Sequence, residues 1–97
     1  MIRMFVHHSV KNYKRWRKSY DAFDAKRLEM GVVGDSVYQA VDDPNDITVS
    51  HDFKTRRRAE SFAASGFLKE AMKTAGVTGR PRIWFVKETK KVNSRRK

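Results

Sequence analysis

The alternation of apolar and polar residues predicts four short strands along this chain. In the first segment, Ile2 to Ser9, the side chains of Met4, Val6 and His8 point to one face and their neighbours to the other. The same period of two recurs in three later segments, Ser36–Val41, Ile47–Phe53 and Pro81–Glu88.

A period of three to four residues marks two helical segments between these strands. The first begins after Asn12, whose side chain can cap a helix, and ends near residue 30, before Gly31. Its apolar stripe consists of Tyr13, Trp16, Tyr20 and Phe23. The second begins after Thr55 and runs to Gly76, with an interruption expected at Ser65-Gly66.

The order β-α-β-β-α-β predicts an α+β fold of the ferredoxin-like type, with a four-stranded antiparallel sheet and both helices on one face. The first and third strands are expected at the centre and the fourth at an edge, where the missing N–H of Pro81 does no harm. Asp42-Asp43-Pro44-Asn45-Asp46 predicts the hairpin turn, and residues 76–79 predict a loop before the last strand. We expect one domain over residues 1–88 and a basic tail over 89–97.

Both faces of the predicted sheet carry large apolar side chains, although helices cover only one of them. The helix-covered face takes Met4, Val6, Val49, Phe53, Ile83 and Phe85. A homodimer would cover the opposite face, because a patch of this kind exceeds what most monomers expose. Its expected interface residues are Phe5, His7, Tyr38, Trp84 and Val86, with Ala40 beside them. The alternative is a different strand register, which would place some of these residues in the core.

The charge of the chain introduces a second candidate partner. Its 97 residues include 22 basic and 11 acidic side chains, for a net charge of +11. Basic residues gather at the starts of both helices, at Lys11, Lys14, Arg15, Arg17 and Lys18 and again at Arg56, Arg57 and Arg58. Nonspecific contact with an anionic partner such as nucleic acid is therefore the alternative function. The third strand lacks the Lys/Arg-Gly-aromatic motif of RNA-recognition domains, so we do not expect the sheet to bind RNA.

The absence of cysteine and of a long apolar run at the N-terminus excludes further classes of protein. The chain has no cysteine, which excludes disulfides and cysteine-ligated zinc. The first residues form no long apolar run, so neither a signal peptide nor a membrane span is predicted and a cytoplasmic protein is the expectation.

His8 is the first candidate for catalysis, because it lies at the end of a central strand beside aromatic residues. An imidazole there could orient a phenolic substrate or accept its proton near neutral pH. The competing interpretation is a hydrogen-bonded histidine at the edge of the core. The residues expected to line a pocket with it are Trp16, Tyr20, His51, Met72 and Ile83.

A metal site is not expected. His51 projects to the same face as His8, but antiparallel pairing puts the two toward opposite ends of their strands, too far apart for shared ligation. Asp52 points to the other face and therefore cannot form an acid–base pair with His51. We expect no cofactor.

Several segments resemble a known superfamily. Val6-His7-His8-Ser9-Val10-Lys11-Asn12-Tyr13-Lys14-Arg15-Trp16 is similar to the strand, histidine and Tyr-x-x-Trp helix that open the antibiotic-biosynthesis monooxygenases. Further matches are Asp42-Asp43-Pro44-Asn45, the segment Phe62–Met72, and Ala75-Gly76-Val77-Thr78-Gly79-Arg80-Pro81.

The resemblance covers residues 2–88 and implies a dimeric α/β barrel with a pocket between the sheet and the helices of each protomer. Members of this superfamily include cofactor-independent quinol or anthrone oxygenases, haem-degrading enzymes and proteins of no known role. The resemblance thus implies a monooxygenase-like enzyme or a binder of a small aromatic or hydrophobic ligand.

Overall fold

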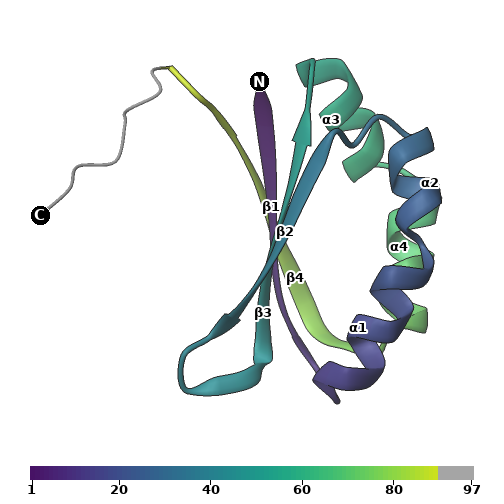
Figure 1. Ribbon diagram of the computed structural model, residues 1–97, viewed down its shortest axis with the longest axis vertical. Helices are drawn as coiled ribbons and strands as arrows, with labels where there is room; N and C mark the ends of the chain where they lie inside the picture. Colours follow the sequence, from purple (N-terminus) through teal and green to yellow (C-terminus); the bar gives the residue numbers. More distant parts are fainter. Residues whose placement is uncertain (90–97) are drawn as a thin grey trace, which may run out of the picture.

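The fold is a four-stranded antiparallel sheet with all the described helices on one side (Figure 1). The computed structural model describes residues 1–89. Its elements are β1 (Ile2–Val10), α1 (Tyr13–Ala22), α2 (Asp24–Glu29), β2 (Gly34–Ala40), β3 (Asp43–Phe53), α3 (Arg56–Ala63), α4 (Gly66–Thr74) and β4 (Val77–Lys87). The strand order β2-β3-β1-β4 confirms the ferredoxin-like α+β class, with β1 and β3 central and β4 at an edge. The predicted basic tail lies outside the described residues, except for Thr89.

Side-chain caps fix where the helices begin. The Asn12 side chain accepts a hydrogen bond from the Arg15 N–H at 3.0 Å, and Ser65 accepts one from the Leu68 N–H at 3.2 Å. These caps satisfy backbone donors that have no partner inside the helix. Ser65 therefore separates α3 from α4, as expected from the sequence, and Gly31 follows α2 with a φ of 101°.

The first helical segment is divided, which the sequence did not predict. Phe23 lies between α1 and α2, and its backbone angles, φ −98° and ψ 12°, are not helical. Its ring packs edge-on against Phe67 of α4, with 5.3 Å between centroids. The second short helix then brings Arg27 into the protein interior, where only 5% of its surface is exposed.

Two predicted loop boundaries were wrong. Residues 77–80 belong to β4, because Val77 and Thr78 pair with Val10 and Ser9 beyond a register shift that follows His7. Gly79 has a φ of 70° beside this irregularity, which explains why a turn-like sequence can occur within a strand. The hairpin turn is shorter than expected: β2 ends at Ala40 and β3 already begins at Asp43.

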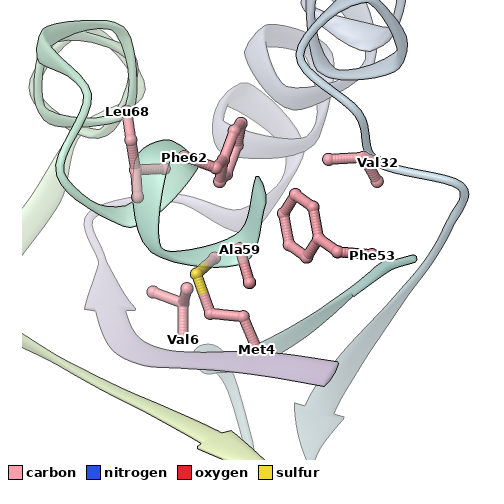
Figure 2. Close-up of a cluster of buried hydrophobic side chains, with 7 residues drawn as sticks. All are labelled: Met4, Val6, Val32, Phe53, Ala59, Phe62 and Leu68. Atoms are coloured by element: carbon pink, nitrogen blue, oxygen red, sulfur yellow. The ribbon is translucent and has the colours of Figure 1, made fainter. Parts of the chain in front are cut away.

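The main hydrophobic core lies between the sheet and α3 and α4. It comprises Met4, Val6, Val32, Phe53, Ala59, Phe62 and Leu68 (Figure 2). Phe85 was expected on this face, and its pairing with Met4 places it there, yet it is 41% exposed. It is left uncovered because β4 is an edge strand and the helices pack over the centre of the sheet.

The other face of the sheet carries the apolar residues expected there. Phe5 and Trp84 stack with 5.3 Å between ring centroids, and Tyr38, Trp84 and Val86 are all more than one third exposed. Figure 1 shows that none of the described helices and strands covers this face. Its pairing with a second copy remains a prediction.

Among residues 1–89, none of the helices has the length and apolar character that crossing a bilayer requires.

Candidate ligand-binding site

A small cavity lies between the sheet and the helices, next to the hydrophobic core. Its volume is about 50 Å³, and it is lined by residues of β1, β3 and all the helices. A water molecule needs roughly 10–15 Å³, so the space corresponds to a few waters, and a cavity that binds one benzene ring is larger, about 150 Å³. Drug-sized ligand sites are larger, on the order of 300–1,000 Å³.

Aromatic and imidazole rings follow one another around this cavity. His8 meets Trp16 at 5.8 Å between centroids, Trp16 stacks on Tyr20 at 5.0 Å, and Tyr20 lies 6.4 Å from His51. The series continues through Phe62, Phe67 and Phe23. These ring faces and edges favour a flat apolar ligand.

The two histidines are the polar groups that the strands contribute. His8 is 5% exposed and His51 is 3% exposed, and Nδ1 of each has no hydrogen-bond partner. Burial lowers the pKa of His8 to about 4. Burial, together with the positive charge of Arg27, lowers the pKa of His51 to about 4 as well. Both imidazoles are therefore neutral at pH 7.

Arg27 is a further polar group at the cavity, and the sequence pattern did not predict it there. Its Nε is buried without a hydrogen-bond partner, and its guanidinium lies 3.6 Å from the centroid of the Tyr20 ring. The signal was present in the sequence, because Arg27 continues the three- and four-residue spacing of Trp16, Tyr20 and Phe23. A charged residue at that position normally indicates that the apolar stripe has ended. Here the arginine is buried and continues it.

Tyr20 connects this cavity to an outer groove between α1, α2 and β2. Tyr20 and Arg27 line both spaces, and the groove also contains Asp21, Asp24 and Asp35. The Tyr20 hydroxyl donates a hydrogen bond to the Asp35 carboxylate. Burial and this hydrogen bond raise the pKa of Tyr20 above its usual range, so it stays protonated and acts as a donor.

The structure brings most of the predicted pocket residues together. His8, Trp16, Tyr20, His51 and Met72 all line the cavity. Ile83 does not line it and instead packs against the Met4–Phe53 core cluster, because its position on edge strand β4 lies beside that cluster. The predicted interface residue His7 lies on the open face, with its Nε2 2.5 Å from an Asp46 carboxylate oxygen.

The strand register separates the two cavity histidines. His51 pairs with Met4, whereas His8 pairs with Ile47, four positions further along β1 and so roughly 13 Å away along the strand. Within residues 1–89, no group of three histidine, cysteine, aspartate or glutamate side chains is arranged to hold a metal ion.

Comparison with known proteins gives matches to solved structures only. No family model and no curated protein matches this sequence. A protein from Bordetella bronchiseptica described as an antibiotic biosynthesis monooxygenase has a TM-score of 0.78 and 14% identity, covering 91% of this chain and 96% of that chain. SnoaB, a cofactor-independent oxygenase from Streptomyces nogalater, has a TM-score of 0.74 and 13% identity in one mutant structure, covering 96% and 97%.

A conserved protein from Methanosarcina mazei Go1 is similar to the same degree, with a TM-score of 0.72 and 17% identity over 91% of this chain and 92% of that chain. Likeness at these identities establishes a fold. The chain therefore has the fold of the antibiotic biosynthesis monooxygenase-like proteins, as its resemblance to them implied.

Proposed function

We propose that this protein binds a single-ring phenol or quinol in the cavity and acts on it as a cofactor-independent monooxygenase. The observation that carries this proposal is the placement of three buried polar atoms without partners, Nδ1 of His8, Nδ1 of His51 and Nε of Arg27, in residues that line one cavity with aromatic walls. Buried polar groups normally have partners, so three at one cavity favour a polar ligand. The oxygenase activity of the fold neighbour SnoaB supports the choice of reaction.

The size of the cavity limits the substrate. About 50 Å³ is less than the roughly 150 Å³ of a cavity that binds benzene, so a one-ring substrate requires side chains to move apart, whereas a three-ring substrate would require the helices to move away from the sheet. The hydroxyl of a one-ring ligand would supply the missing hydrogen bond of one of these buried side chains.

The chemistry follows from the charge of the site. A neutral imidazole of His8 or His51 accepts the phenolic proton, and the nearby positive charge of Arg27 stabilises the ring anion that forms. The electron-rich ring then reacts with O₂. For 1,4-hydroquinone the products are 2-hydroxy-1,4-benzoquinone and water: one oxygen atom forms a bond to a ring carbon, the other leaves as water, and the ring supplies the electrons.

Binding and turnover are tested separately, beginning with binding under nitrogen. The chain has two tryptophans, so a Trp84→Phe variant makes Trp16 the sole emitter. Titration with 1,4-hydroquinone is expected to change the Trp16 emission in a saturable way, and 1,4-cyclohexanediol is expected to leave it unchanged. Absence of any saturable change with the quinol would refute the binding site.

Turnover is then measured as O₂ uptake above the rate without protein. We expect substitution of the histidine that accepts the proton, His8→Gln or His51→Gln, to lower this uptake by about 100-fold or more, the scale of general acid–base catalysis, and His7→Gln on the open face to leave it unchanged. Saturable binding without protein-dependent O₂ uptake would show a ligand-binding protein rather than an oxygenase.

We also propose that two copies pair through the open face of the sheet. Phe5, Tyr38, Trp84 and Val86 form an apolar surface that water would otherwise contact. Trp84→Glu is expected to convert a dimer to a monomer in sedimentation velocity at micromolar concentration, because it places a charge within this apolar surface. Leu28→Glu, on an exposed position of α2, is the matched control. A wild-type protein that sediments as a monomer would contradict the pairing.

A further inference from the structure

The buried arginine Arg27 has less compensation for its charge than a buried guanidinium normally receives. Its Nε has no hydrogen-bond partner, and the nearest carboxylate oxygens belong to Asp24 at 3.7 Å and Asp35 at 3.9 Å. Both distances exceed hydrogen-bonding range. The Asp24 side chain is also 76% exposed, so water screens much of its charge.

The groups that face Arg27 from the other elements do not replace these hydrogen bonds. From α1, the Tyr20 ring lies under the guanidinium, and its hydroxyl is directed to Asp35 of β2. From β3, His51 is held neutral, in part by the charge of Arg27 itself. The wall of the cavity therefore contains one permanent positive charge among neutral side chains, with its negative counterparts on the outer-groove side.

We propose that Arg27 makes the cavity selective for single-ring ligands that carry a negatively charged oxygen, a phenolate or a carboxylate. An anionic oxygen at Nε would complete the missing hydrogen bond and balance the charge in surroundings with a low dielectric constant. This inference rests on the proposed function, because it specifies the charge of a ligand in the same cavity. Arg27 is thereby a specificity-determining residue.

The ionisation of a coloured ligand tests this directly. The probe is 4-nitrophenol, whose phenolate is yellow and whose neutral form is not. At pH 6, where the free compound is mostly neutral, binding is expected to raise the phenolate absorbance about fivefold, equivalent to a lowering of the ligand pKa by about one unit. Trp16 emission in the Trp84→Phe background reports binding independently of the colour.

Substitutions then assign the effect to Arg27. Arg27→Met, which preserves much of the side-chain length, is expected to bind 4-nitrophenol in its neutral form, without the rise in absorbance. Arg57→Met removes the same charge from an exposed position of α3 and is expected to behave like the wild type. Arg27→Lys keeps the charge but lacks Nε, and we expect a smaller rise than in the wild type. If circular dichroism shows that Arg27→Met is unfolded, Arg27→Lys is the variant compared with the wild type.

Competition separates the two kinds of anion. Benzoate is expected to displace the bound phenolate, and benzamide, which has the same shape without the charge, is not. Binding of neutral 4-nitrophenol by the wild type, a rise in absorbance as large in both Arg27 variants as in the wild type, or equal competition by benzamide would overturn the selectivity and leave the binding site intact. Absence of any Trp16 response would overturn the site and the selectivity together.

Discussion

Acidification from pH 7 to pH 4 is expected to reduce the free energy of unfolding by about 3 kcal/mol for each of the two buried histidines, His8 and His51. The pKa of each is lowered from 6.5 to about 4 in the folded protein, mainly by burial. As the pH falls below 6.5, the unfolded chain takes up these protons before the folded chain does. The stabilisation is therefore complete above pH 6.5 and is lost as the pH falls toward 4.

Urea unfolding at a series of pH values measures this effect. The loss from two histidines approaches the whole stability of a typical small domain, about 5–15 kcal/mol, so the wild type should unfold readily near pH 4. The double variant His8→Gln/His51→Gln is expected to show a much flatter dependence between pH 6.5 and pH 4. His7→Gln is the matched control, since the His7 imidazole is 37% exposed on the open face. An equally steep dependence in the double variant would show that these histidines are not the cause.

Phe53→Ala is expected to lower the free energy of unfolding by about 3–5 kcal/mol. Phe53 has no exposed surface and packs with Phe62, at 5.5 Å between ring centroids, in the cluster of Figure 2. Removal of its ring leaves a cavity that the surrounding sheet and α3 cannot fill without distortion. Thermal and urea unfolding, followed by far-UV circular dichroism, give the value.

Phe85→Ala is the matched control for this core substitution. Phe85 lies on the same face of the sheet, but it is 41% exposed at the edge, so its truncation should have less than half the effect of Phe53→Ala. Equal losses for the two variants would mean that the edge of the sheet is covered in solution. A negligible loss for Phe53→Ala would contradict the position of the core.

The volume of the cavity is small for the number of aromatic rings that surround it. The cavity holds little more than a few waters, yet three of its lining side chains have buried polar atoms without partners. A ligand of one ring requires the smallest enlargement of this cavity and can still hydrogen-bond one of these groups, whereas a larger ligand would require the helices to move. The experiments with hydroquinone and 4-nitrophenol therefore test ligand size and ligand charge at the same residues.

The sequence by itself determined the strands, the class of fold and the order of strands in the sheet. Periods of two and of three to four residues are local properties, and chain connectivity restricts their arrangement to a few topologies. The alternation in β1 also placed Met4, Val6 and His8 on the helix-covered face, where all three are buried. Helix caps such as Asn12 and Thr55 were likewise predictable, because a cap depends on residues close in sequence.

Tertiary structure alone decided the features that depend on contacts between distant segments. Packing of Phe23 against Phe67 accompanies the division of the first helix, and pairing with β1 extends β4 through residues that read as a loop. Arg27 is buried because α2 directs it toward Tyr20 and the cavity, against the usual preference of arginine for the surface. Local sequence gives no measure of that burial, since it arises only when the helices, the sheet and the cavity come together.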